Sequence, residues 1–263
     1  MIRLVVSNQR GGVAKTTTVT TMARVFADMG MKILIIDTDS QGSVASILNL
    51  KPENYLYNFL VNNQAFRDCI VEAGQNIHVM CSNRRTVEAE AVFMGVTGRE
   101  MAFDNVFPLE DDHYDVVLLD VAPSITLLQT CSMVYAKAIL IPVAMDPLSL
   151  QGAMASIQTA ASLNKLFRLN IKVAGILPVM VNRRLRMTDM ILNSLEELSQ
   201  TYTVPLLPPI RTDTAVNQAA KMRKFIADFD PKAKAVEDYT EATKQLMDHL
   251  AGRTTTEELK TAV

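Results

Sequence analysis

The sequence has few cysteines, and they are far apart. Cys69, Cys81 and Cys131 are the only three among 263 residues, and none belongs to a C-x-x-C pair. No group of cysteine and histidine has the spacing of a zinc site. The pattern therefore indicates buried, reduced thiols of a cytosolic protein rather than metal ligands or disulfides.

Long apolar runs, a leader and linkers are also missing. No run approaches the roughly 20 apolar residues that a membrane-spanning helix needs, and a strand-like segment follows the first residue directly, without a basic and apolar leader. No stretch rich in Pro, Gly or Ser divides the chain, and no internal repeat is present. We expect a soluble, cytoplasmic protein with one domain over residues 1–252 and a polar tail over 253–263.

The chain has no excess of basic charge. Its 26 Lys and Arg and 28 Asp and Glu give a formal net charge of −2, while 49% of the residues are hydrophobic and 21% charged. The composition is ordinary for a globular protein. A generally basic surface is excluded, so any contact with nucleic acid must come from a local patch.

Short β-branched segments alternate with longer amphipathic segments along the chain, as in β-α-β units. The predicted strands are residues 3–6, 32–37, 77–81, 116–120, 138–143, 173–181 and 203–207. The predicted helices are residues 16–29, 87–94, 125–136, 151–167, 187–200 and 231–250. Because the strands are apolar almost throughout, we predict an α/β fold in which helices cover both faces of a twisted, mostly parallel sheet.

The segment that joins the first predicted strand to the first predicted helix is residues 7–18, with the sequence S-N-Q-R-G-G-V-A-K-T-T-T. A glycine turn that leads into a helix directs backbone N–H groups and the positive end of the helix dipole at an anion. In such a loop Lys15 would reach the β- and γ-phosphates of a nucleotide, and the Thr16 hydroxyl would bind Mg²⁺. The usual pattern G-x-x-x-x-G-K-[ST] fails twice, because Gln9 and Ala14 occupy the positions of its glycines. The segment alone indicates either a chance match or a deviant nucleotide-binding loop.

Acidic residues follow two other predicted strands. Asp37 and Asp39 come at the end of the second strand, and Asp120 ends the fourth. Ligands of open α/β sheets bind at this carboxyl edge, and an acid that ends an apolar strand is the Walker B arrangement, so we expect Asp120 to hold Mg²⁺ or its water. Asp37 and Asp39 share a strand face if the strand continues that far, and one of them can then support Mg²⁺ while the other orients the attacking water. Any one acid alone is equally explained as a helix N-cap or a turn residue, but the whole set indicates a nucleotide site.

Three segments resemble a known family. Residues 9–17 are similar to the deviant Walker A loop K-G-G-x-G-K-[ST] of the ParA/MinD ATPases. Residues 37–43, D-T-D-S-Q-G-S, resemble that family's D-x-D-P-Q-G-N segment, and residues 120–124, D-V-A-P-S, resemble its D-x-P-P-S segment. The resemblance covers about residues 2–250 and favours the ParA branch over the MinD branch.

The resemblance implies a P-loop NTPase fold, ATP and Mg²⁺ as cofactors, an ATP-dependent homodimer with nucleotide between the subunits, and slow hydrolysis that a partner protein stimulates. It implies catalytic roles for Lys15, which binds phosphate, for Asp39, the acid associated with hydrolysis, and for Arg10, in place of a lysine that reaches the phosphates of the partner subunit. The implied nucleotide-binding residues are Gly11, Gly12, Val13, Ala14, Lys15, Thr16, Thr17 and, beside the adenine, Asn182. The implied metal ligands are Thr16, Asp37 and Asp120.

Two positions in the loop depart from the family pattern. Arg10 keeps the charge of the family's lysine, but a planar guanidinium either clamps phosphate oxygens in a bidentate way or is too bulky to enter the nucleotide sandwich. Ala14 replaces the glycine before the phosphate-binding lysine. Alanine is tolerated there if the position needs only helical angles, whereas a positive φ would strain the loop and slow hydrolysis.

Basic residues gather in two late segments, with one arginine between them. The predicted DNA-binding residues are Arg183, Arg184, Arg186, Arg211, Lys221, Arg223 and Lys224. In ParA-like proteins the corresponding regions contribute to sequence-independent DNA binding, and a few basic side chains doubled by a dimer can neutralise several phosphates. No aromatic residues are interleaved for base stacking, so we expect backbone contact without base readout. An ordinary solvated surface is the alternative, because the net charge is slightly negative.

The resemblance to the ParA branch implies a partition ATPase that binds non-specific DNA and segregates plasmid or chromosomal DNA with a ParB-like adaptor, in a cytoplasmic and nucleoid-associated location. A positioning ATPase for a protein cargo, of the carboxysome-distributing type, has the same chemistry and stays an alternative.

Two further alternatives have specific requirements. A MinD-like membrane-cycling ATPase needs a terminal amphipathic helix with basic and exposed apolar residues, but the helix predicted over residues 231–250 carries several acids, and we expect its Tyr239 and Leu246 to face the core. An iron–sulfur reductase of the nitrogenase iron-protein type needs two cysteine ligands per subunit near the dimer axis, and Cys81 and Cys131 lack the glycine-rich context of such ligands.

Overall fold

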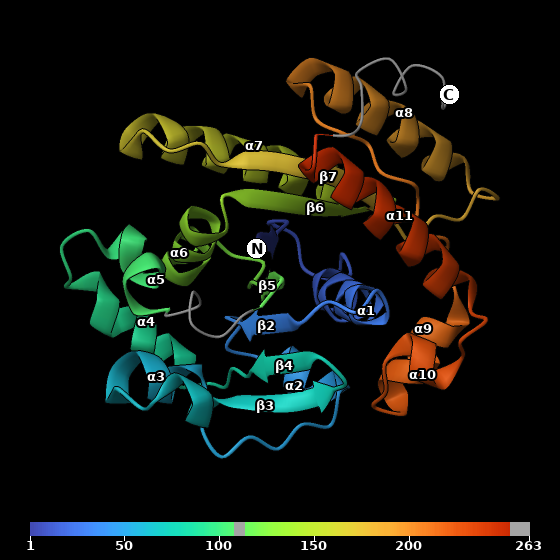
Figure 1. The fold of residues 1–263 in the computed structure, drawn as a ribbon. Coiled ribbons are helices and arrows are strands. Elements are labelled where there is room, and N and C mark those ends of the chain that lie inside the picture. Colours follow the sequence, from blue (N-terminus) through green and yellow to red (C-terminus); the bar gives the residue numbers. More distant parts are fainter. Residues whose placement is uncertain (108–113, 253–263) are drawn as a thin grey trace.

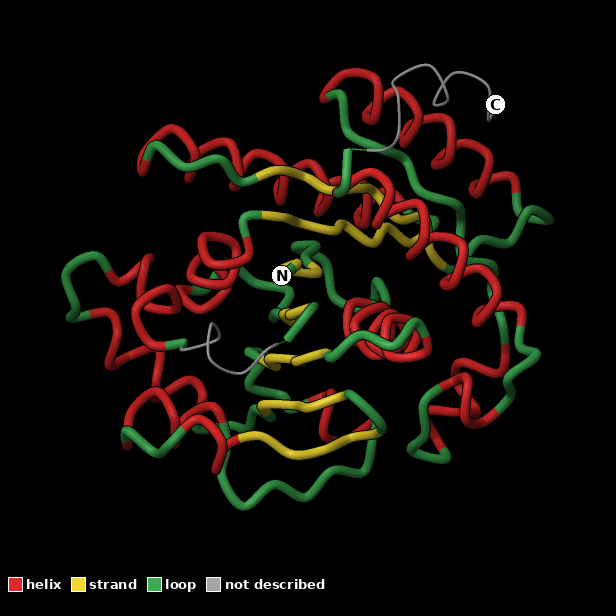
Figure 2. The backbone as a smooth tube through the Cα atoms, in the orientation of Figure 1, coloured by secondary structure: helices red, strands yellow, loops and turns green. Residues whose placement is uncertain are grey.

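One mostly parallel sheet lies at the centre of the computed structural model, which describes residues 1–107 and 114–252. Within these residues the sheet has seven strands in the order β3-β4-β2-β5-β1-β6-β7, and Figure 2 shows them as one twisted stack between the helices. The strands are β1 (Ile2–Val6), β2 (Ile33–Asp37), β3 (Ile70–Gly74), β4 (Ile77–Met80), β5 (Val116–Asp120), β6 (Ala138–Ala144) and β7 (Lys172–Val179). All neighbours pair in parallel except β3 and β4, which are antiparallel. The predicted α/β fold class is confirmed.

Helices cover both faces of this sheet. They are α1 (Lys15–Asp28), α2 (Ser43–Ile47), α3 (Leu56–Asn62), α4 (Thr86–Met94), α5 (Ala102–Val106), α6 (Leu127–Ala136), α7 (Pro147–Phe167), α8 (Arg186–Tyr202), α9 (Thr214–Lys221), α10 (Ile226–Phe229) and α11 (Lys234–Leu250). Figure 1 shows α4, α5 and α6 on one side of the central strands and α1 on the other, with α11 along α1. Each face therefore has its own apolar core.

The residues of β5 show why the central strands are apolar throughout. Val117 and Leu119 pack in one core with residues from α3 to α8, whereas Val116 and Leu118 pack in the other core with residues from α1 and α11. Alternate side chains of a strand point to opposite faces, and here both faces are covered. Burial of both sets explains the continuous hydrophobic pattern that predicted a parallel sheet.

The register of the three central strands determines where their ends meet. In the parallel pair of β1 and β5, Val6 lies opposite Asp120, and in the pair of β2 and β5, Asp37 lies opposite Asp120. The segments that follow β1, β2 and β5 therefore start at one edge of the sheet, next to one another. This is the edge at which open α/β sheets bind their ligands.

The strand predicted over residues 203–207 is wrong. In the structure this segment makes only an isolated bridge, between Leu206 and Ile176 of β7. Pro205, Pro208 and Pro209 lie in or directly after it, and proline lacks the N–H group that a strand ladder needs. The segment therefore runs along the edge of the sheet without becoming a strand.

The prediction missed β3 and the short helices α2, α3, α5, α9 and α10. β3 ends in Gly74 and pairs with β4 through a tight turn in which Asn76 has a φ of 62°. A five-residue antiparallel edge strand that is only half-buried has no continuous apolar run to mark it. The longer predicted helices all exist, with ends that differ by a few residues.

The last helix, α11, packs against the body of the protein. Tyr239 and Leu246 are buried, as expected from the sequence. No helix among the described residues combines the length and apolar character that a membrane crossing requires. The polar tail predicted over residues 253–263 lies outside the described residues.

Candidate functional site

The loop between β1 and α1 surrounds the side chain of Lys15. The Lys15 ammonium donates hydrogen bonds to the backbone carbonyls of Asn8 (3.2 Å) and Arg10 (2.9 Å), and Lys15 is buried. Burial lowers the pKa of this ammonium, while the nearby carboxylates of Asp120 and Asp39 oppose part of that shift. The loop therefore folds around one positive charge at the N-terminus of α1, which is a suitable site for an anion.

Ala14, the last residue before α1, has a left-handed backbone with φ 58° and ψ 28°. The Cβ atom makes this conformation unfavourable by roughly 1–2 kcal/mol for residues other than glycine. Gly12 in the same loop also has a positive φ, of 77°, at which its missing side chain avoids this cost. Of the two possibilities that the sequence left open for Ala14, the structure shows the strained one.

Asp120 connects the end of β5 to the start of α1. The Thr16 hydroxyl donates a hydrogen bond of 2.6 Å to Asp120 Oδ2, and Oδ1 of the same carboxylate is buried with no partner among the described residues. Burial raises the pKa of Asp120 to about 7, although the Thr16 hydrogen bond and the Lys15 charge oppose the shift. An unpaired carboxylate oxygen beside a threonine hydroxyl is a donor set of the kind that Mg²⁺ binds.

Asp37 is the second buried carboxylate at this edge. It accepts hydrogen bonds from the backbone N–H groups of Asp39 (3.0 Å) and Val44 (3.3 Å). Burial, and then the neighbouring charge of Asp120, raise the pKa of Asp37 well above its usual range. A divalent cation close to both carboxylates would offset this repulsion.

Asp39 does not share a strand face with Asp37, because β2 ends at Asp37. The condition for a shared face, a strand that continues to Asp39, is therefore not met. Asp39 is half-exposed and its Oδ1 accepts the backbone N–H of Gln41 at 2.9 Å, which starts the turn into α2. Its carboxylate nevertheless lies near enough to act on the charge of Lys15. Asp39 is thus a loop residue at the rim of the site, while Asp37 lies in its floor.

The remaining predicted residues lie farther along the same edge or outside the site. Asn182 follows β7, and its Oδ1 accepts the backbone N–H of Arg184 at 3.1 Å in a turn before α8. The exposed basic residues just before and at the start of α8, and at the end of α9 and directly after it, are Arg183, Arg184, Arg186, Lys221, Arg223 and Lys224. Arg223 donates to the side chain of Asn49 at 2.9 Å.

Arg211 differs from the other predicted DNA-binding residues. Its guanidinium forms ion pairs with Asp238 (2.5 Å) and Glu237 (2.8 Å). A guanidinium that is already paired with two carboxylates has little free capacity for DNA phosphate. We therefore remove Arg211 from the proposed DNA-binding set.

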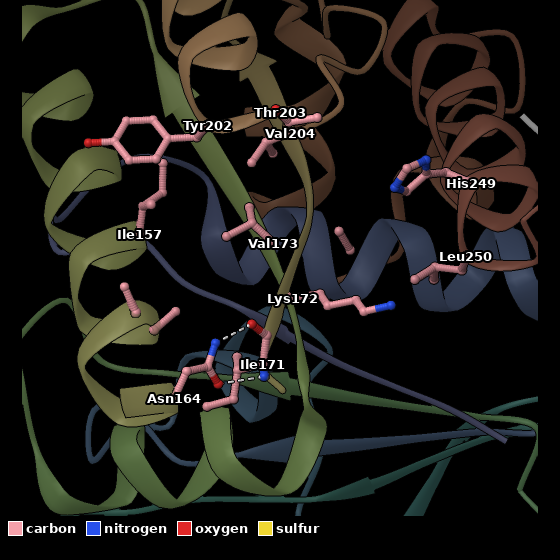
Figure 3. A pocket seen from close by; sticks show the side chains of 13 residues that line it. Ile157, Asn164, Ile171, Lys172, Val173, Tyr202, Thr203, Val204, His249 and Leu250 are labelled. Atoms are coloured by element: carbon pink, nitrogen blue, oxygen red, sulfur yellow. Dashed lines mark hydrogen bonds between the residues drawn. The ribbon is translucent and has the colours of Figure 1, made fainter. Parts of the chain in front are cut away.

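A cavity of about 400 Å³ lies apart from these residues, between α7, the start of β7 and the ends of α8 and α11. Figure 3 shows that apolar side chains such as Ile157 and Val173 line it, with Lys172 and His249 at its edges. Both polar atoms of the Asn164 amide bond to the backbone of Ile171. None of the predicted site residues lines this cavity, so its volume does not mark the site.

The sequence and fold of this chain match characterised proteins along most of its length. A family model described as "AAA domain" matches residues 1–173, which is more than half of the chain. The sporulation initiation inhibitor protein Soj of Bacillus subtilis is 24% identical over 92% of this chain and 97% of its own length. The chromosome partitioning protein ParA of Myxococcus xanthus is 25% identical over 92% of this chain and 86% of its own. The chain belongs to the ParA/MinD-type ATPase family.

Solved structures agree with this membership. A protein from Mycobacterium smegmatis, described as cobyrinic acid a,c-diamide synthase with bound ADP and magnesium, superposes with a TM-score of 0.80. It is 25% identical, and the match covers 97% of each chain. McdA from Cyanothece, at 17% identity, has a TM-score of 0.82 over 94% of this chain and 99% of its own, which supports the fold.

The structure also assigns a role to residues that sequence reasoning missed. The Asn8 amide donates to the carbonyls of Pro142 (2.8 Å) and Ser149 (3.0 Å), and Gln9 donates to the Thr159 hydroxyl of α7 at 2.9 Å. A side chain at Gly152 of α7 would clash with the Asn8 side chain and come within 3.1 Å of Arg10. In this member of the ATPase family, α7 therefore holds the loop from outside. A glycine inside a helical pattern was the available signal, because it costs about 1 kcal/mol unless close packing requires it.

The strain at Ala14 leads to a stability prediction for this ATPase-family loop. Ala14→Gly removes the Cβ clash but adds freedom to the unfolded chain, so we expect the free energy of unfolding to rise by up to about 1 kcal/mol. Urea denaturation measures this change. Ala161→Gly, at an exposed interior position of α7, is the control and should lower the same free energy by about 1 kcal/mol. An equal loss of stability in both variants would show that Ala14 is not strained.

Proposed function

We propose that this chain binds ATP with Mg²⁺ at the carboxyl edge of β1, β2 and β5 and hydrolyses it slowly to ADP and phosphate, as a partition ATPase. The observation that carries the proposal is the arrangement of Lys15 inside its loop beside the Thr16–Asp120 hydrogen bond. The Lys15 ammonium and the buried carboxylates of Asp37 and Asp120 meet there at one helix N-terminus. This is the set of groups that phosphoryl transfer from a nucleotide requires.

In this proposal each group of the loop has a separate task. The ammonium of Lys15 pairs with the terminal phosphates, and the α1 N-terminus adds the dipole of the helix. The backbone groups that contact the phosphates belong to Gly11, Gly12, Val13, Ala14, Lys15, Thr16 and Thr17. The amide of Asn182 contacts the adenine.

The donor set at the floor of the site fits a magnesium ion. Thr16 and Asp120 would hold the ion, and Asp37 would hold its water shell. Among the described residues no cluster of three or more His, Cys, Asp or Glu is arranged for a metal, so the remaining ligands would be phosphate oxygens and water, as is usual for Mg²⁺. When bound, Mg²⁺ neutralises charge on the phosphate oxygens.

Asp39 is exposed enough to bind and orient a water molecule for hydrolysis. It is half-exposed at the rim, where its carboxylate can accept a hydrogen bond from a water molecule and orient it toward the terminal phosphorus. The new P–O bond forms to the oxygen of that water, the bond from the terminal phosphorus to the bridging β-phosphate oxygen breaks, and the proton of the water passes to the departing phosphate and the solvent, which leaves ADP and phosphate. If Asp39 only orients the water and no strong base removes its proton, the hydrolysis is slow.

Substitutions at Lys15 and Asp39 test the ATPase proposal. Lys15→Ala removes the loop's cation, so we expect ATP affinity measured by calorimetry to fall at least about a hundredfold. Asp39→Ala should keep ATP binding and lose most of the phosphate release. Lys32→Ala, an exposed lysine just before β2, is the control and should match the unmodified protein. Unchanged ATP affinity in Lys15→Ala would remove the loop from the proposal.

We also propose that the active form is an ATP-dependent homodimer in which Arg10 reaches the phosphates of the partner subunit. Arg10 is exposed at the outer side of the loop, and only its backbone carbonyl contacts Lys15. Its guanidinium lies at the surface, where its charge acts on Asp146 and where a second copy would approach. A planar guanidinium can bind two phosphate oxygens at once.

Arg10→Ala separates dimer formation from nucleotide binding. We expect the dimer dissociation constant with ATP and Mg²⁺, measured by analytical ultracentrifugation, to rise at least about tenfold. The ATP affinity of the monomer should change little. Arg10→Lys keeps the charge and should restore most of the dimer. Equal dimerisation by Arg10→Ala and the unmodified protein would show that Arg10 does not act across the interface.

For the dimer we propose non-specific DNA as a matrix and a ParB-like adaptor as the stimulating partner, with a cytoplasmic, nucleoid-associated location. The exposed arginines at the start of α8 and the exposed basic residues after α9 are the proposed contacts. Basic side chains without interleaved aromatics bind phosphates and not bases. Relatives named for chromosome partitioning support this form of the proposal.

Charge reversal at the start of α8 tests the DNA contact. In the variant Arg183→Glu, Arg184→Glu, Arg186→Glu we expect the DNA affinity of the ATP-bound protein to fall at least about tenfold and its salt dependence to become weaker. Gel retardation at several salt concentrations measures both. The control carries the same change of net charge at three exposed residues near the opposite end of β7, Lys165→Glu, Arg168→Glu, Lys172→Glu. Equal losses in both variants, or no retardation by the unmodified protein, would contradict the proposed contact.

A further inference from the structure

Arg211 and Asp238 form the most extensive ion pair around the candidate site. Nε of Arg211 donates to both oxygens of the Asp238 carboxylate (3.0 and 2.9 Å), and Nη2 donates to Oδ1 (2.5 Å). The backbone N–H of Arg211 also donates to Oδ2 at 2.8 Å. Asp238 is only 7% exposed. The carboxylate thus fixes the main chain of residue 211 as well as its side chain.

The segment that Asp238 holds in this way is paired with the end of β7. The backbone N–H of Ile210 donates to the carbonyl of Pro178 (2.8 Å), that of Val181 donates to Ile210 (2.9 Å), and that of Thr212 donates to Val181 (3.0 Å). Asn182 is the next residue after Val181. The position of the Asn182 backbone therefore depends on a segment that Asp238 anchors.

The neighbour of Asp238 on α11 contacts the other end of the site. The Tyr239 hydroxyl lies 3.0 Å from the Thr18 hydroxyl of α1, and both residues are buried. Thr18 is in the first turn of α1, the helix that also carries Lys15 and Thr16. Asp238 and Tyr239, which are successive residues of α11, thus fix the Asn182 side and the phosphate side of the site relative to each other.

The side chain of Asn182 has a donor left for a ligand. Its Oδ1 accepts the Arg184 N–H, whereas its Nδ2 donates to none of the described residues. In a fixed orientation the amide N–H₂ can donate to N1 of adenine while the second lone pair of Oδ1 accepts from the N6 amino group. Guanine presents an N1–H and the O6 carbonyl at these two places, so both contacts would become unfavourable. The orientation of Asn182 can therefore distinguish ATP from GTP.

We propose that Arg211 is a positioning residue for nucleobase recognition: clamped by Asp238, it holds residues 210–212 against the end of β7 and thereby orients Asn182. This role rests on the proposed nucleotide binding, and it adds a group of residues that determines which base is bound. It also gives Arg211 a task other than DNA contact. Arg211 itself touches neither the base nor the phosphates.

Glu237 provides a matched control, because it accepts a hydrogen bond from the same guanidinium on its exposed side. Nη2 of Arg211 donates to Glu237 Oε2 at 2.8 Å, and the Glu237 side chain is 76% exposed. Asp238→Asn and Glu237→Gln each remove one negative charge beside Arg211. The two variants have the same net charge, but only Asp238→Asn weakens the clamp on the backbone of residue 211.

Calorimetry with ATP and with GTP, each with Mg²⁺, tests the proposal, together with gel retardation by DNA. In Asp238→Asn we expect the ratio of ATP to GTP affinity to fall at least about tenfold, whereas Glu237→Gln keeps the ratio of the unmodified protein. Arg211→Lys retains the charge without the bidentate geometry and should lower the ratio as Asp238→Asn does. This second variant decides the question if Asp238→Asn does not fold, with circular dichroism as the check.

Three results are separable. An unmodified protein that binds no ATP would contradict the proposed function itself. An unmodified protein that prefers ATP, together with an unchanged ratio in both Asp238→Asn and Arg211→Lys, would overturn only the positioning role. Tighter DNA binding with a steeper salt dependence in Asp238→Asn, at an unchanged nucleotide ratio, would instead make Arg211 a phosphate contact that Asp238 restrains.

Discussion

Asp120 lies level with Val6 on one neighbouring strand and with Asp37 on the other, because β1, β5 and β2 pair in parallel without a shift. The rest of the site depends on this register. It makes the loop after β1, the floor carboxylates and the N-terminus of α1 start at the same level of the sheet. A shift of one residue in β5 would turn Asp120 toward the opposite face, and the Thr16 hydroxyl would then have no carboxylate to bond. The same register places two acids side by side in the interior. Burial raises the pKa of each, and the neighbouring charge of Asp120 raises the pKa of Asp37 further.

Two helices that contribute no predicted catalytic group keep this arrangement in place. On one face α7 holds the loop through hydrogen bonds of Asn8 and Gln9 and through the close approach at Gly152. On the other face α11 holds the loop's own helix through Tyr239. The loop therefore lies between supports on both faces of the sheet. This external support is consistent with a strained Ala14 at its end, because local strain persists only where surrounding contacts determine the conformation.

The sequence predicted those features of the structure that depend on residues close together along the chain. Continuous apolar runs identified the central strands. The order strand, glycine loop and helix around Lys15 and Thr16, with Asp120 at the end of another strand, predicted that these residues lie at one edge of the sheet, and Thr16 does bond to Asp120 there. The sequence did not predict contacts between distant segments, such as Asn8 with α7 or Arg211 with Asp238. The local sequence around one residue of such a pair carries no information about which distant residue it contacts. Residues 203–207 show a different limit, since their β-like composition did not outweigh three prolines that remove backbone donors. The two-residue spacing of Asp37 and Asp39 shows another limit: it places both acids on one face only while the strand continues, and the sequence did not show that β2 ends at Asp37.

The hydrogen bonds of Lys15 to the carbonyls of Asn8 and Arg10 have a consequence for the kinetics of ligand capture. In the structure the loop already satisfies its own ammonium, so an arriving phosphate enters by exchange and competes with two internal acceptors. Each of those carbonyls then needs a new donor or water, and the association step includes a small rearrangement of the main chain. Because these hydrogen bonds must be exchanged, phosphate associates with the loop more slowly than charge attraction alone would give.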